Sequence, residues 1–123
     1  MRINQDVLKT RKKCEALARK TLVAGKVAVI DRSNFNVDQR KTWVDMAKEN
    51  NVRCECIVFE TGNKDVYISR CQQRKGHETV HPSKAAAVVS MMSRQFMPPV
   101  VRGGEKFHRL ENVNDRISTW RIV

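Results

Sequence analysis

Two arginines that lie four residues apart, Arg70 and Arg74, have the spacing best suited to chemistry with anions. Residues four apart share one face of a helix, so both guanidinium groups would point the same way. Each guanidinium is a planar fork of donors that matches phosphate oxygens, and two such forks can hold one polyphosphate. The pair indicates a phosphate-binding helix. The alternative is a solvated basic face without a ligand, because Lys64 and Lys75 lie close by.

A second polar group, with the sequence DRSN, occupies residues 31–34 directly after a short apolar run at 27–30. Ligands of α/β proteins bind at the carboxyl ends of strands, so Asp31 would face such a site. Arg32 and Arg40 are then candidates for contact with nucleic-acid phosphates. The alternative is that Asp31 ends the strand and the residues after it form a turn.

Asp6 stands near the start of the first predicted helix, behind Asn4 and Gln5. A carboxylate at a helix start can point into a site at the ends of the strands. It can equally be a first-turn acid that complements the helix dipole. Both interpretations remain open at this point.

Cysteine and histidine do not form a metal-binding pattern in this sequence. The four cysteines contain no C-x-x-C pair and the three histidines add no zinc spacing, so we expect no metal site. Cys54 and Cys56 alternate within an apolar run, which places both on one face of a strand as small buried thiols. For His77 and His81 we favour a capping or exposed loop role over contact with substrate.

The charge of the chain is strongly positive. Its 123 residues hold 24 Lys and Arg against 13 Asp and Glu, a formal net charge of +11. Such a charge attracts polyanions over a Debye length of about 8–10 Å, and nucleic acid is the commonest polyanion. A solvated basic surface, an acidic protein or a membrane surface would also fit. The sequence shows neither a signal peptide nor an apolar stretch near 18 residues, so we expect an intracellular protein of the nucleus or cytoplasm.

Helix-like and strand-like segments alternate along the chain. The predicted order is a helix at 7–22 ended by Gly25, a strand at 27–30, a helix from the Asn36 cap to Asn50, a strand at 54–59, a helix at 65–74, a loop at 75–81, and a helix from Pro82 to Phe96, followed by one or two short strands. Continuous apolar runs are typical of strands covered on both faces in parallel sheets. We therefore predict a single α/β domain.

Four features stand in a telling order: the start of the first helix, the DRSN turn with Arg40, the Arg70-x-x-x-Arg74-x-x-His77 segment, and Phe96-x-x-Pro99. This order resembles the kinase domain of the polynucleotide kinase/phosphatase family and its P-loop kinase relatives. The resemblance implies a three-layer α/β/α fold with a mainly parallel sheet. It also implies that residues 1–123 form a single incomplete domain with a lid at about 64–82.

The resemblance implies roles for particular residues: Asp6 as the catalytic acceptor of the 5′-hydroxyl proton, Arg70 and Arg74 as lid contacts to nucleotide phosphates, and Asp31, Arg32, Asn34 and Arg40 as substrate or nucleic-acid contacts. The intact family uses ATP and Mg²⁺ and phosphorylates DNA or RNA 5′ ends in repair. Nucleic acid is thus the partner we expect, and no membrane.

The sequence departs from the family in one respect, because no G-x-x-x-x-G-K-[ST] loop is present. That loop cradles the β- and γ-phosphates and its Ser or Thr holds magnesium. We therefore expect an N-terminally truncated domain that binds neither ATP nor Mg²⁺ tightly and is inactive. Alternatives are a non-catalytic basic nucleic-acid-binding module derived from a kinase, and a fragment of a small-molecule or tRNA P-loop kinase.

The family strand that carries this loop lies between the strands that match residues 27–30 and 54–59. Without it, we predict one of three outcomes for the sheet. The two strands pair directly, the chain is marginally stable or oligomeric, or a missing N-terminal segment or a partner completes the sheet.

Overall fold

A computed structural model of the chain describes residues 1–59, 63–75, 81–101 and 104–113. Predictions for His77, for the glycine at 103 and for residues 117–123 lie outside these ranges. The elements in chain order are β1 (Arg2–Asn4), α1 (Gln5–Leu8), α2 (Arg11–Val23), β2 (Val29–Asp31), α3 (Val37–Glu49), β3 (Glu55–Phe59), α4 (Lys64–Gln73), the 3₁₀ helix η1 (Pro82–Lys84), α5 (Ala85–Gln95) and β4 (Arg109–Val113).

Among the described residues, the strands form two separate parallel pairs. β1 pairs with β2, with Ile3 opposite Ile30, and β3 pairs with β4, with Cys56 opposite Leu110. The predicted α/β class with parallel strands is confirmed. The possibility of direct pairing between β2 and β3 is wrong, because the two strands belong to different sheets.

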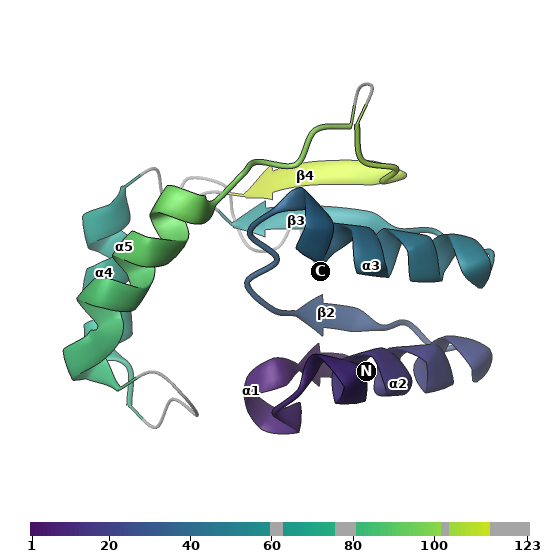
Figure 1. Cartoon of the computed structure of the whole chain (residues 1–123), viewed down its shortest axis with the longest axis horizontal. Helices are drawn as coiled ribbons and strands as arrows, with labels where there is room; N and C mark the ends of the chain where they lie inside the picture. Colours follow the sequence, from purple (N-terminus) through teal and green to yellow (C-terminus); the bar gives the residue numbers. More distant parts are fainter. Residues whose placement is uncertain (60–62, 76–80, 102–103, 114–123) are drawn as a thin grey trace.

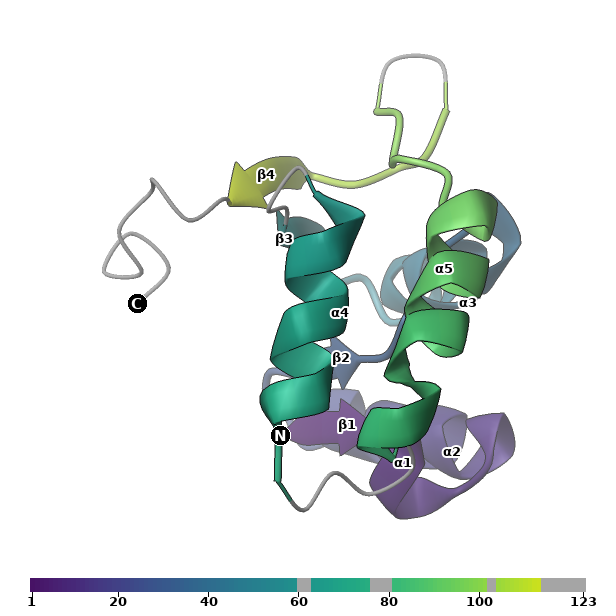
Figure 2. The same ribbon diagram turned by 90° about the vertical axis from the view of Figure 1, so that its left-hand side faces the viewer.

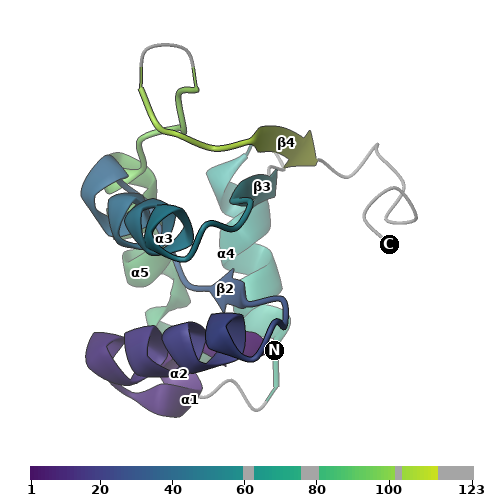
Figure 3. The ribbon, with the colours of Figure 1, turned by 90° about the vertical axis from the view of Figure 1, so that its right-hand side faces the viewer.

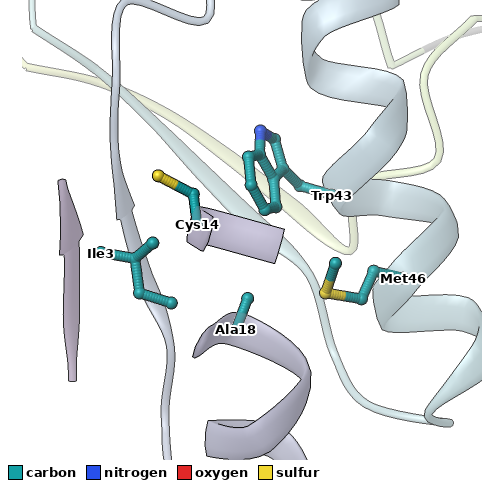
Figure 4. Packing of buried hydrophobic residues seen from close by; sticks show 5 residues of the cluster. All are labelled: Ile3, Cys14, Ala18, Trp43 and Met46. Atoms are coloured by element: carbon teal, nitrogen blue, oxygen red, sulfur yellow. The ribbon is translucent and has the colours of Figure 1, made fainter. Parts of the chain in front are cut away.

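Helices α2 and α3 lie on the same side of β2 and β3 (Figures 2 and 3). Between these helices and the β1–β2 pair lies the main core, whose buried residues are Ile3, Cys14, Ala18, Trp43 and Met46 (Figure 4). The opposite side of the strands stays open, with Val29 55% and Phe59 67% exposed. The prediction that both strands are covered on both faces is therefore wrong for the described structure.

The first predicted helix is in fact two helices. α1 ends at Leu8, and Lys9 then takes a left-handed backbone conformation with φ of 72°. Thr10 begins α2 as its N-cap, because its hydroxyl oxygen accepts the Lys13 N–H at 3.2 Å. The apolar periodicity continues across the break, which is why periodicity alone predicts one helix.

The predicted caps of α2 and α3 are confirmed. Gly25, with φ of 70°, donates its N–H to the Leu22 carbonyl at 2.9 Å, the hydrogen bond of a glycine-ended helix. Asn36 accepts the Gln39 N–H at 2.8 Å at the start of α3. Asn51 closes α3 in the left-handed region with φ of 54°.

Helices α4 and α5 form a hairpin that stands beyond the carboxyl ends of the strands, to which the arrowheads of β2 and β3 point (Figure 1). The hairpin helices and η1 pack chiefly on one another. No residue of α4 is buried, and Ala85 is the buried residue of α5. No helix in the described ranges has the length and apolar character needed to cross a membrane.

Candidate functional site

Asn4, at the carboxyl end of β1, connects two of the predicted site residues. Its side-chain oxygen accepts the N–H of Asp6 at 2.7 Å and that of Val7 at 3.3 Å, which caps α1. Its side-chain nitrogen donates to Asp31 Oδ2 at 3.1 Å. Asn4 is 8% exposed, so this link is fixed within the fold. The structure thus brings Asp6 and Asp31 to one end of the β1–β2 pair.

Arg2 is a partner of Asp31 that sequence reasoning missed. Its Nε and Nη2 atoms each lie 2.7 Å from Asp31 Oδ2, and the two side chains are 61% and 48% exposed. An exposed pair of this kind contributes about 0–1 kcal/mol to stability. Because Arg2 belongs to a three-residue strand without an apolar run, the sequence held no signal for it.

Arg32 packs against α3. Its Cζ atom lies 5.7 Å from the centre of the Trp43 ring, a cation–π distance. Its Nη1 atom is buried and has no hydrogen-bond partner among the described residues. Burial lowers the pKa of this guanidinium, although arginine stays charged in proteins. The ring contact uses none of the N–H donors of Arg32, so the contact with nucleic acid stays a prediction.

Arg40 is engaged inside the protein. Its Nε donates to Glu105 Oε1 at 2.7 Å and its Nη2 to Glu105 Oε2 at 3.1 Å, while the side chains are 4% and 6% exposed. Its Nη1 donates to the Asn34 carbonyl oxygen at 2.9 Å. This geometry opposes the predicted role of Arg40 as a phosphate contact and gives it a structural role. Glu105 follows Arg40 by 65 residues, so no local pattern announced the pair.

The side-chain oxygen of Asn34 is also engaged within the protein. Its Oδ1 accepts the indole N–H of Trp43 at 3.2 Å, and its backbone is left-handed with φ of 42°. A short polar side chain tolerates this conformation better than most residues do. The turn interpretation of residues 31–34 therefore describes Asn34 better than the contact interpretation does.

The hairpin arginines lie on the surface. Arg70 is in the last turn of α4, and Arg74 follows the helix, one residue beyond its end at Gln73. Both are exposed, and Arg74 donates from Nη2 to the Cys71 sulfur at 3.5 Å. Nearby, His81 accepts the Ser83 N–H at 3.3 Å and so caps η1, the capping role favoured from the sequence.

The thiols of Cys54 and Cys56 lie on the half-buried face of the β3 segment, as the alternation predicted. Burial is the main cause that raises the pKa of both thiols. A raised pKa makes them poor nucleophiles at neutral pH. They act as packing residues and do not extend the site.

The described residues do not fit an ATP–magnesium cradle. The sequence contains no phosphate-binding loop, and the described ranges hold no group of three or more His, Cys, Asp or Glu residues arranged for a metal ion. A hollow of about 260 Å³ beside Asn4 is lined by the apolar residues Val7, Leu8 and Leu17 together with Asn4 and Arg2. The Arg2 guanidinium can donate to a phosphate, but a single arginine does not replace the backbone N–H groups of a phosphate-binding loop.

Parallel strands with polar residues at their carboxyl ends, opposite a helical hairpin, form a domain of the α/β class. The family described as AAA domain matches residues 2–99, and the chain belongs to that family. The resemblance to polynucleotide kinases that the motifs indicated is confirmed at the level of the family.

Several known proteins are similar to this chain over most of its length. It is 32% identical over 126 residues to the bifunctional polynucleotide phosphatase/kinase of Schizosaccharomyces pombe, covering 97% of this chain and 29% of the relative. It is 42% identical over 113 residues to a putative bifunctional polynucleotide phosphatase/kinase of Acanthamoeba polyphaga mimivirus, covering 90% and 26%. It is 32% identical over 109 residues to the Arabidopsis thaliana transcription factor bHLH140, covering 84% and 12%. The chain thus spans less than a third of each relative.

Proposed function

We propose that this chain forms the acceptor side and lid of a polynucleotide 5′-hydroxyl kinase domain of the kind that acts in DNA or RNA end repair. The observation that carries the proposal is the link made by Asn4, which joins the Asp31 carboxylate to the first turn of α1 that holds Asp6. This edge of the strands faces the hairpin that bears Arg70 and Arg74 (Figure 1).

Each residue at this edge has a role in the proposal. Asp6, half-buried in the first turn of α1, accepts the proton of the attacking 5′-hydroxyl. Asp31 and its partner Arg2 orient the acceptor end of the nucleic acid. Arg70 and Arg74 bind polyphosphate, as arginines do in phosphoryl transfer. Arg40 and Asn34 are not carried forward as direct contacts, because Glu105 and Trp43 hold their side chains. Arg32 remains a candidate contact to nucleic-acid phosphate, because no hydrogen bond within the described ranges holds its buried Nη1 atom.

The partner in this proposal is a polyanion. A net charge of +11 favours a nucleic-acid strand over a small neutral acceptor, because each phosphate contact releases counterions. Inside the cell, in the nucleus or cytoplasm, such strands are abundant and the four free cysteines stay reduced.

The donor side needs groups that these 123 residues lack, since a P-loop supplies most of the stabilisation of the transferred phosphate. We therefore expect this chain alone to bind ATP weakly and not to transfer phosphate. Within the described residues, β2 and β3 each pair on one side. A further segment or partner that completes the sheet between them would be the natural place for the donor site.

The test is binding and phosphate transfer with one purified preparation. A fluorescent single-stranded oligonucleotide with a 5′-hydroxyl is titrated at 50 and at 200 mM salt, and transfer of labelled γ-phosphate from ATP is followed in parallel. We expect binding that weakens steeply with salt, and no transfer. Absence of binding at low salt would overturn the proposal, and phosphate transfer would overturn the expected inactivity.

The lack of a P-loop motif favours a second candidate, a non-catalytic nucleic-acid-binding module. Adding the donor-side segment of a relative as a separate polypeptide distinguishes the two candidates. Restored phosphate transfer to the oligonucleotide supports the kinase. Unchanged binding without transfer supports the module, and transfer to a small hydroxyl compound or tRNA instead would assign another acceptor.

A further inference from the structure

The chain that leaves the hairpin is bound at two points, to the turn after β2 and to the start of α3. The Met97 N–H, just beyond α5, donates to the Phe35 carbonyl at 2.7 Å. Further along, Glu105 receives two hydrogen bonds from Arg40, near the start of α3. Segments more than 60 residues apart in sequence are therefore held side by side at the base of the hairpin.

The Arg40–Glu105 pair is buried and has hydrogen-bond partners on both sides. Besides its two bonds to Glu105, Arg40 donates Nη1 to the Asn34 carbonyl at 2.9 Å. Glu105 Oε2 also accepts the Val100 N–H at 3.2 Å, and the Glu105 N–H donates to the Val100 carbonyl at 2.6 Å. A buried charge pair is tolerated when all its partners are in place, so this network holds Val100 and Glu105 in one position beside α3.

The hairpin depends on its ends for its position. Its helices pack chiefly on one another, and α4 has no buried residue with which to dock on the strands. At the incoming end, the Tyr67 hydroxyl donates to the Phe59 carbonyl at 3.4 Å. At the outgoing end stand the Met97 hydrogen bond and the buried pair. Because α5 packs against α4, the outgoing anchor also determines where Arg70 and Arg74 stand.

We propose that Arg40 and Glu105 are positioning residues, which anchor the outgoing end of the hairpin and thereby set Arg70 and Arg74 opposite Asp31 for binding of a polyanion. Arg40 acts through the hairpin and does not touch the nucleic acid. The inference rests on the proposed function, because that function gives the hairpin arginines a ligand.

The anchor is tested by amide hydrogen exchange of the full chain carrying Glu105→Gln. We expect exchange in α5 and at Met97 to rise about tenfold or more, while the amides of α2 keep their wild-type rates. The matched control is Glu49→Gln, which removes an exposed partner of Arg19 on α3 and leaves the hairpin unchanged. Wild-type exchange in α5 of the Glu105→Gln variant would overturn the anchor.

The positioning role is tested by a double-mutant cycle on the affinity for the 5′-hydroxyl oligonucleotide. Arg74→Ala weakens binding in the wild-type background and has little further effect in the Glu105→Gln background, because the hairpin is no longer held in place. Additive effects overturn the positioning role. If the wild-type chain binds no oligonucleotide, the proposed function fails and positioning fails with it, whereas the exchange experiment still decides the anchor.

Should Glu105→Gln fail to fold, the double variant Arg40→Met with Glu105→Met replaces it. Exchange of a buried ion pair for apolar side chains generally preserves stability, so this variant keeps the fold but loses the hydrogen bonds to Asn34 and Val100. We expect the same raised exchange in α5 and the same loss of coupling to Arg74. Wild-type exchange together with wild-type coupling would show that the ion pair is not the anchor.

Discussion

The predicted phosphate contact of Arg74 is well suited to a test by substitution. It is exposed just beyond α4, and its described contact is a weak one to the Cys71 sulfur. We expect Arg74→Ala to weaken oligonucleotide binding about three- to tenfold and to lower the salt slope by about 0.7, the share of one phosphate on a single strand. The measurement is fluorescence anisotropy across a salt series.

Arg53→Ala is the matched control for this change. Arg53 is an exposed arginine, 68% exposed, and it precedes β3 at the end of the strand remote from the proposed site. We expect this variant to bind like wild type. Equal losses for the two variants would mean that charge alone, and no defined site, accounts for binding.

Cys54 and Cys56 give the chain a pH-dependent contribution to stability. Burial raises the pKa of both thiols in the folded state, so the unfolded chain releases these protons first. The contribution is therefore complete below the unfolded pKa of about 8.5 and is lost as the pH rises towards the folded values. Urea unfolding under reducing conditions at pH 7.5 and 9.5 measures the decline. A Cys54→Ala, Cys56→Ala variant should decline less, and an equal decline would contradict the assignment.

At the residue scale, the sequence predicts where a residue lies in a helix or strand better than it predicts which distant residue it contacts. The position of Asp31 at a strand end was predictable, because the apolar run before it is a local signal. Asn4 and Asp6 likewise show the local signature of a helix start. Arg40 was misassigned because a basic residue near a turn looks exposed unless its acid is known. Its partner Glu105 lies in another part of the chain, and tertiary packing alone brings the two together.

At the scale of the element, substitutions at the ends of α2 and α3 should change stability in opposite directions. Both helices end in a left-handed residue, Gly25 with φ of 70° and Asn51 with φ of 54°. Gly25→Ala meets no atom within 4 Å, so its cost is backbone strain, about 1–2 kcal/mol. Asn51→Gly relieves the same strain and should be neutral or stabilising by up to about 1 kcal/mol. Chemical denaturation of both variants checks the signs, and stabilisation by Gly25→Ala would contradict this account.

Element ends were predictable here and element interiors less so. Caps such as Asn36 and Gly25 are dictated by local backbone chemistry, and the structure has them where the sequence puts them. The break at Lys9 was missed because the apolar spacing runs through it. The open face of β3 was missed because an apolar run alone does not reveal whether the surrounding chain covers one side or two.

At the scale of the whole molecule, the described chain is a layer of helices on one side of two short sheets, with the other side open. The parallel pairing of each sheet follows from the alternation of strands and helices. The absence of a pairing between β2 and β3 is a global property, because it depends on what lies between them and on no residue within either strand.

This open side leads to a prediction about assembly. Val29 and Phe59 are 55% and 67% exposed on strands whose facing edges are unpaired among the described residues. Unpaired strand edges and exposed apolar side chains both favour association. We therefore expect a melting temperature that depends on protein concentration, and sedimentation faster than that of a monomer. A cooperative melt of a monomer, independent of concentration, would contradict the prediction.

Substitution on this face tests whether the strands cause the association. Val29→Thr with Phe59→Thr keeps residues of high strand propensity but removes apolar surface. We therefore expect this variant to bind less of a dye that recognises exposed apolar surface, and to sediment more slowly. The control is Val23→Thr at the end of α2, because Val23 is 81% exposed but belongs to no sheet. The control removes exposed apolar area from a helix. A loss of association in the strand variant alone would therefore assign the effect to the open sheet. An equal loss in both variants would assign it to exposed apolar surface in general.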